Sequence, residues 1–305
     1  MSLLLAVLVG AVRGGTSILY AALGETIAER AGVINLGTEG CMLVGALSGY
    51  AVAAETGNPW IGAIAGVIAG GMLALIHAVL VLSRNANQLA SGLVVLFFAL
   101  GITSLFGAAY VGESINAFTP WAIPGLSSIP WLGEIFFDHD PLTYLSFIAG
   151  PAVWYLLYRS RWGLILRASG ERDQVLAAYG HSPLKVRYVA VVAGGALAGL
   201  GGAQLSTAYA NAWFENMTQG RGFIAVALVI FAAWQPMRVV AGAYLFGAAL
   251  ALSPALQARG YGFNQFALDA IPYLVTICVL VVLGRRRAHA APEGLRKVFE
   301  MAPTS

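Results

Sequence analysis

Charged side chains are scarce in this sequence. Only 10% of the 305 residues are Asp, Glu, Lys or Arg, and 59% are apolar, whereas a soluble domain is about a quarter charged. A chain with so few polar groups cannot cover a water-exposed surface, which excludes an ordinary soluble enzyme, a disordered chain and a nucleic-acid binder. We therefore expect the chain to be solvated by lipid.

Cysteine and the common catalytic motifs are also scarce or missing. The two cysteines, Cys41 and Cys278, lie in apolar runs, which favours small buried residues over a disulfide or a metal pair. The sequence contains no GxxxxGK[ST] phosphate loop and no HExxH, CxxC or GxSxG motif. The prediction is a chain that is not an enzyme and binds no cofactor or metal, so any ATP must be used by a partner.

What the sequence does contain is a series of apolar runs. A membrane span needs about 20 residues, and the nine runs at 3–23, 33–53, 60–82, 89–110, 142–158, 188–208, 222–236, 239–257 and 268–284 fill most of the chain. The prediction is one all-α polytopic membrane domain over residues 1–305, with about 8–10 transmembrane helices. The 37 glycines, many in pairs, indicate close helix packing.

The basic residues predict the orientation. Most of them lie in the segment 159–187 and in the tail 285–305, and both are therefore placed in the cytoplasm. The loop 111–141 contains four acidic residues and no Arg or Lys, so it is an outer loop, and its prolines and tryptophans predict a structured element. Counting crossings back from there places Arg30 and Arg84 inside and the N-terminus outside.

Polar residues interrupt the apolar pattern between Gly24 and Ala46, in the stretch GETIAERAGVINLGTEGCMLVGA. A charged side chain at the centre of a transmembrane helix costs about 2.5–3.5 kcal/mol on insertion scales, so these residues should face a cavity or each other. Glu25 and Glu29 share a helix face and would repel, and Arg30 either relieves this repulsion or reaches the lipid boundary. A simple cytoplasmic turn is the alternative interpretation.

A similar polar stretch, WFENMTQGRGF, precedes the short apolar run at 222–236. By the predicted orientation, Glu39 opens a span from the inside and Arg221 opens one from the outside. Similar elements that enter from opposite faces are typical of inverted repeats, with the substrate path between the two halves. The sequence therefore raises the hypothesis of an inverted repeat.

A third polar stretch, LRASGERDQVLAAYGHSPLKVR, occupies 166–187. Its composition predicts a helix over 168–178, ended by Gly180 and followed by Pro183. Acidic and basic residues nearly balance in this helix, which favours docking onto a protein over binding to anionic lipid.

Three motifs carry a resemblance to a known family. ERAGVINLGTEG at 29–40, NQLASGL at 87–93 and ENMTQGRGFIAVA at 215–227 resemble permease subunits of bacterial ABC importers in the branched-chain amino acid and simple-sugar permease superfamily, in its nucleoside branch. The resemblance spans roughly residues 15–285. It implies a type II-like importer permease fold in the bacterial inner membrane. It also implies a second permease subunit (identical or paralogous), a cytoplasmic ABC ATPase and an extracytoplasmic substrate-binding protein.

The resemblance also implies a set of coupling residues. The family's coupling loop maps onto Ala168, Gly170, Glu171, Asp173, Ala177 and Gly180, which makes Asp173 to Tyr179 the helix that sits in the ATPase. For the translocation path, polar side chains near the apolar runs suit a hydroxyl-rich solute; these are Asn35, Glu39, Asn87, Gln88, Glu215 and Asn216.

The function that follows is a permease for nucleosides or related ribose-containing solutes. A permease for another sugar or for branched-chain amino acids is the alternative with the same fold. An ion-coupled secondary transporter is the alternative from another class, and His77 and Asp269 are the only candidates for its proton site.

Overall fold

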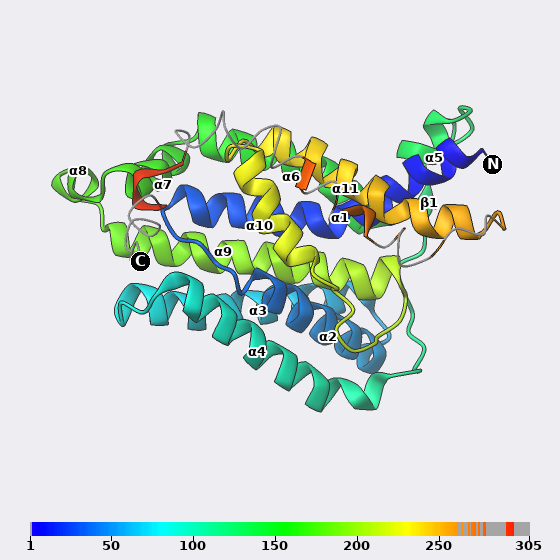
Figure 1. Ribbon diagram of the computed structural model, residues 1–305, viewed down its shortest axis with the longest axis horizontal. Helices are drawn as coiled ribbons and strands as arrows, with labels where there is room; N and C mark the ends of the chain where they lie inside the picture. The colour runs from blue at the N-terminus through cyan, green and yellow to red at the C-terminus, as the bar shows by residue number, and fades with distance from the viewer. Residues whose placement is uncertain are drawn as a thin grey trace.

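The structure is a computed structural model that describes residues 2–260, 264, 268, 270–272, 274, 277–278 and 291–295. Figure 1 shows a bundle of long helices that run between two ends. Its apolar helices are α1 (Leu3–Arg30), α2 (Thr38–Thr56), α3 (Pro59–Ala78), α4 (Gln88–Gly107), α6 (Pro141–Arg159), α9 (Pro183–Gln204), α10 (Arg221–Phe231) and α11 (Pro236–Gln257). The predicted all-α class is confirmed, apart from one two-stranded hairpin.

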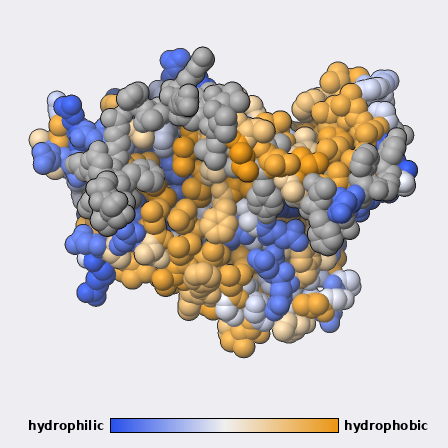
Figure 2. All heavy atoms as spheres, in the orientation of Figure 1, coloured by the Kyte–Doolittle hydropathy of each residue, from blue (hydrophilic) through white to orange (hydrophobic). Residues whose placement is uncertain are grey.

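These eight helices occupy the first eight predicted runs. Among the described residues, five helical segments are long and apolar enough to cross a membrane, namely Leu3–Arg30, Pro59–Ser83, Gln88–Tyr110, Pro183–Tyr209 and Pro236–Gln257. The ninth run, 268–284, and the tail, 285–305, fall largely outside the described residues, and so does Asp269. On the face seen in Figure 2, apolar residues cover much of the middle of the molecule.

The smaller elements lie at the two ends of the bundle. The outer loop forms an antiparallel hairpin of β1 (Trp121–Ala122) and β2 (Asp138–His139) with α5 (Leu132–Phe136) between the strands. This hairpin lies at the end that also holds the N-terminus, while α7 (Arg161–Glu171) and α8 (Asp173–Ala178) lie at the other (Figure 1). The loop 111–141 is therefore structured, and it lies at the opposite end of the bundle from α7 and α8.

Short caps start three of the long helices. The side chains of Asn58, Asp140 and Ser182 each accept a hydrogen bond from a backbone N–H two or three residues further on. A proline follows each cap at the first helical position, where no N–H is needed. These caps set where α3, α6 and α9 enter the bundle.

Glycines allow the central helices to touch backbone to backbone. A Cβ atom added to Gly202 on α9 would lie 1.8 Å from the Met42 carbonyl oxygen of α2, and one on Gly70 of α3 would lie 2.4 Å from the Gly195 carbonyl oxygen. No side chain fits these contacts. The paired glycines thus bring α9 against its neighbours, as the packing interpretation predicts.

Helix α10 does not cross the membrane as the predicted span would. It has 11 residues, a length of about 16 Å at the helical rise of 1.5 Å per residue, against a hydrocarbon core of about 30 Å. Its start lies inside the bundle, next to the start of α2 (Figure 1). The prediction that Glu39 and Arg221 open spans from opposite faces is therefore wrong, because their helix starts are in contact. The inverted repeat stays a hypothesis.

We expect Gly202→Ala to destabilise the protein, because the new methyl group would overlap the Met42 carbonyl. Overpacking of this kind costs about 1–3 kcal/mol. Thermal unfolding of the detergent-purified protein measures the effect. The matched control is Gly101→Ala on α4, where nothing lies within 4 Å of the new Cβ. Equal melting temperatures for the two variants would contradict the close approach of α9 to α2.

Candidate functional site

The contact between the starts of α2 and α10 is made by Glu39. This side chain is buried, and its Oε1 accepts hydrogen bonds from the Thr218 hydroxyl at 2.6 Å and the Gly220 N–H at 2.8 Å. Its Oε2 accepts one from the Gly222 N–H at 2.5 Å. The first N–H groups of a helix have no partner within the helix and carry partial positive charge. Glu39 therefore caps α10 from a helix about 180 residues away in sequence.

The chain before α10 is shaped to bring those N–H groups to Glu39. Asn211, Asn216, Gln219 and Gly220 all have positive φ, between 48° and 82°, a region that Asn and Gly adopt more easily than other residues. Gly222 is needed for a different reason, since a Cβ there would lie 2.5 Å from the Cα of Glu39. The turns and the missing side chain together explain the sequence NMTQGRG.

The non-helical segment 31–37 before α2 is held in a similar way. Glu25 of α1 accepts hydrogen bonds from the Asn35 N–H and from the Thr38 hydroxyl, both at 2.8 Å. The Asn35 side-chain oxygen accepts one from the Gly37 N–H at 3.0 Å. Backbone that leaves the helix at membrane depth must find partners inside the protein, and these polar side chains supply them.

Two further side chains hold the same segment at Ile34. The Gln88 side-chain oxygen accepts a hydrogen bond from the Ile34 N–H at 2.8 Å. His77 lies between the Ile34 carbonyl, 3.0 Å from its Nε2, and the Ser91 hydroxyl, 3.1 Å from its Nδ1. Both nitrogens of the buried imidazole have partners, which favours a structural role over a proton relay.

At the C-terminal end of α1, Glu29 and Arg30 contact the connection between α10 and α11. The Trp234 indole N–H donates to a carboxylate oxygen of Glu29 at 2.5 Å. Arg30 donates to the Trp234 carbonyl at 3.2 Å and to the Tyr158 hydroxyl at 2.9 Å. Neither expected role of Arg30 describes it: among the described residues it forms no ion pair, and it ties α1 to α6 and to the end of α10.

The structure separates the six predicted path residues into two groups. The first group lies around the segment 31–37 and consists of Asn35, Glu39 and Gln88. Their side-chain oxygens accept hydrogen bonds from the backbone of that segment or from the start of α10. The exposed Asn87 caps α4 by accepting from the N–H groups of Leu89 and Ala90. Glu215 and Asn216 are also exposed and lie in the chain that leads into α10.

The polar stretch 166–187, called the coupling segment below because it resembles the family's coupling loop, forms two helices rather than the single helix predicted over 168–178. The backbone breaks at Arg172, and α8 starts at Asp173, close to the helix that the resemblance implies. Gly180 follows with φ of +79°, as a helix stop requires. Glu171, Ala177 and Gly180 are exposed and Ala168 is half-buried.

Gly170 and Arg187 connect this segment to the end of α1. A Cβ on Gly170 would lie 2.3 Å from the Arg30 carbonyl oxygen, so α7 contacts α1 directly. Arg187 of α9 donates from Nε to the Ala31 carbonyl at 3.2 Å and from Nη2 to the Ser169 carbonyl at 2.8 Å. The same nitrogen lies 3.5 Å from an oxygen of Asp173. One arginine thus bridges α8, α7 and the segment that leads to α2.

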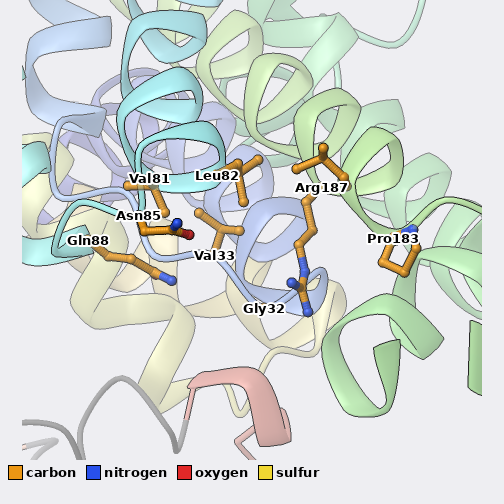
Figure 3. A pocket seen from close by; sticks show the side chains of 9 residues that line it. Gly32, Val33, Val81, Leu82, Asn85, Gln88, Pro183 and Arg187 are labelled. Carbon is orange, nitrogen blue, oxygen red and sulfur yellow. The ribbon is translucent and has the colours of Figure 1, made fainter. Parts of the chain in front are cut away.

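Arg187 and Gln88 line one cavity of about 370 Å³ at this end of the bundle. Figure 3 shows Asn85 and Gln88 at one side of it and the Arg187 guanidinium at another, with Gly32 and Val33 between them. The segment 31–37 therefore lies between a predicted path residue and the arginine that holds the coupling segment.

The stretch WFENMTQGRGF contains Arg221, Gln219 and Thr218, but the sequence did not indicate any of the three as a site residue. Nor did it indicate that Thr218 is a partner of Glu39. The glycines on both sides of Arg221 were the available signal, because they mark a close backbone approach. The partner of that approach, Glu39, is too distant in the chain for any local pattern to reveal.

We expect Glu39→Gln to lower the stability of the protein. The amide NH₂ would face one of the N–H groups that the carboxylate accepts from, and the charge at the start of α10 would be lost. Loss of a hydrogen bond to a charged group costs about 1.5–3 kcal/mol. Thermal unfolding in detergent measures this, with Glu215→Gln as the matched control, since Glu215 is exposed. The cap would be disproved if both variants had the same melting temperature as the wild type.

Comparison with known proteins matches residues 4–282 to the family described as the permease component of a branched-chain amino acid transport system. A putative glucose ABC transporter permease protein of Haloferax volcanii is 43% identical over 302 residues, which cover 92% of each chain. A guanosine ABC transporter permease protein of Bacillus subtilis is 32% identical over 90% of this chain and 91% of its own.

A nucleoside ABC transporter permease protein of Lactococcus lactis is 31% identical over 90% of this chain and 92% of its own. No solved structure matches the chain. The family model and these full-length relatives confirm the resemblance that the three motifs carry. The chain belongs to this permease family, and it is a multi-pass membrane component of an ABC transporter, not an enzyme itself.

Proposed function

We propose that the chain forms the translocation path for a neutral, hydroxyl-rich solute, with nucleosides or related ribose-containing compounds as the first candidate. The observation that carries this is the match, along 90% of the chain, to two permeases whose names give guanosine and nucleosides as cargo. The polar chemistry at the helix starts supports it. The buried carboxylates of Glu25 and Glu39 there accept hydrogen bonds from hydroxyl and backbone N–H groups of the protein, so their oxygens are not offered to a cationic solute.

A monosaccharide is the second candidate. The relative named as a putative glucose permease is 43% identical to the chain, a higher identity than that of the two nucleoside permeases. A sugar and a nucleoside share ring and hydroxyl oxygens, so one polar site can suit either. The family description names branched-chain amino acids, which makes them the third cargo to test.

As an ABC permease the chain works with an ATPase and a substrate-binding protein. For the ATPase we propose docking through α7 and α8, with Ala168, Gly170, Glu171, Asp173, Ala177 and Gly180 as the coupling residues. On α8 and just after it, Val175 and Tyr179 are 47% and 80% exposed. Apolar side chains that stand out on a cytoplasmic segment suit burial in a partner. A second permease subunit, identical or paralogous, completes the path in the plasma membrane.

In this proposal Arg187 transmits movement of the coupling segment to the path. ATP-driven closure of the ATPases would shift α7 and α8, and Arg187 holds both Asp173 and the Ala31 carbonyl. The segment 31–37 would then move and carry Glu39, and with it the start of α10. Access to the path would change from the outer to the inner side.

The cargo proposal is tested by ATP-dependent uptake into proteoliposomes that contain the permease, its ATPase and its binding protein. Labelled guanosine, glucose and leucine are compared in the same preparation. We expect guanosine to be taken up, with glucose uptake supporting the second candidate. Uptake of leucine alone, or of none of the three, would overturn the proposal of a hydroxyl-rich cargo.

The coupling proposal is tested by Arg187→Ala. We expect transport to fall at least about tenfold while the assembled complex still hydrolyses ATP, because the loss of about 1.4 kcal/mol of coupling corresponds to a factor of ten. Lys185→Ala is the matched control, since Lys185 is exposed two residues away on the same helix. Wild-type transport by Arg187→Ala would contradict the role of this arginine.

A further inference from the structure

A second cavity, of about 310 Å³, lies beside the start of α10, at the lower end of the range for small-molecule sites. It is bounded by α10, by the second half of α11 and by two residues further along the chain. Its lining residues are Gln219, Arg221, Ile224, Ala249, Leu250, Ser253, Leu268 and Pro272. None of these belongs to the sets of path or coupling residues that the sequence predicted.

The charged residue of this cavity is Arg221, whose hydrogen-bond partners among the described residues are the side chains of Ser17 and Tyr209. Only 9% of the residue is exposed. Its Nη1 lies 3.5 Å from the Ser17 hydroxyl, the outer limit of a hydrogen bond. Its guanidinium lies 5.2 Å from the centre of the Tyr209 ring, and the Tyr209 hydroxyl oxygen accepts a hydrogen bond from it. A guanidinium has five N–H donors. Among the described residues, no carboxylate forms an ion pair with it.

Among the described residues, the carboxylate that acts electrostatically on Arg221 is that of Glu39, and its oxygens accept hydrogen bonds from other groups. Glu39 lies against Gly222, but its two oxygens accept from Thr218, Gly220 and Gly222. A buried cation is costly at membrane depth unless its N–H donors have partners, and the Ser17 and Tyr209 hydroxyls can serve only part of the five on Arg221. A polar ligand in the adjoining cavity would supply those partners, and this is the physical reason to assign the cavity a ligand.

The charges around the cavity indicate what kind of ligand fits. Arg221 is positive, and Glu39, which accepts from the N–H groups of the neighbouring Gly220 and Gly222, is negative, so the pair favours a neutral solute over an anion. The planar guanidinium fork suits two neighbouring oxygen acceptors, and Gln219 adds a polar side chain. Ile224, Leu250 and Pro272 form an apolar wall for the face of a sugar ring or a base.

We propose that this cavity is a solute-binding subsite of the path, in which Arg221 donates hydrogen bonds to the hydroxyl or ring oxygens of a neutral sugar or nucleoside. The inference rests on the proposed function and adds to it a solute-binding residue, Arg221, and the location of the subsite beside the start of α10. The subsite lies where α10 is capped by Glu39, so movement of that helix start would change the geometry of the subsite.

The experiment compares two variants in the reconstituted complex, using whichever of guanosine and glucose the wild type transports. Arg221→Gln removes the charge and the fork, and Ala249→Leu fills the cavity while leaving Arg221 in place. Arg238→Gln is the matched control, because Arg238 is an exposed arginine at the start of α11, outside the cavity. The readouts are the KM and maximal rate of uptake, and ATP hydrolysis stimulated by the binding protein.

We expect both variants to assemble, to keep ATP hydrolysis, and to lose at least about tenfold in maximal rate over KM, while Arg238→Gln transports normally. Arg221→Lys should recover part of the loss, since it restores the charge without the fork. Normal uptake by either cavity variant would overturn the subsite. If Arg221→Gln fails to assemble, Ala249→Leu alone decides. A wild-type complex that transports neither solute would instead refute the proposed function.

Discussion

The structure depends on one constraint: backbone that leaves a helix inside a membrane must be hydrogen-bonded by the protein itself. The chain does this twice, in the segment 31–37 and in the turns before α10. Both times, buried carboxylates accept hydrogen bonds from backbone N–H groups. Glu25 accepts from the Asn35 N–H, and Glu39 accepts from the N–H groups of Gly220 and Gly222. Two of the rare acidic residues of this chain, Glu25 and Glu39, are therefore placed where helices are interrupted.

This arrangement joins the two ends of the proposed mechanism. Gly170 and Arg187 fasten the coupling segment to the end of α1, and the segment 31–37 continues from there to Glu39. Glu39 in turn holds the start of α10, where Arg221 faces a cavity. A movement at the ATPase end thus has a short, hydrogen-bonded route to the membrane interior. The π-helical turns Val79–Ser83 and Leu205–Tyr209 flank the same region, and such turns are frequent at functional sites.

Much of this could be predicted from local sequence. Apolar runs predicted the helices, proline and cap residues mark their starts, and paired glycines such as Gly201 and Gly202 predicted close packing, because each of these signals acts within a few residues. The unusual polar stretches were also recognised as sites that must face a cavity or each other. Their partners were not, since Glu39 and Gly222 meet only through the folded bundle.

Two local predictions failed for tertiary reasons. The composition of 168–178 favours one helix, but Gly170 is packed on the Arg30 carbonyl and Asp173 is drawn towards Arg187, so the helix breaks between them. The run at 222–236 has the hydropathy of a span, yet its first residues are tied to the start of α2 in the interior.

Hydrogen–deuterium exchange of the backbone amides of Asn35, Gly220 and Gly222 tests the central claim most directly. The account predicts that these amides, although they lie outside or at the very start of helices, exchange as slowly as those in the middle of α2. Exchange as fast as that of the exposed turn at Gly112, where nothing lies within 4 Å of an added Cβ, would contradict it.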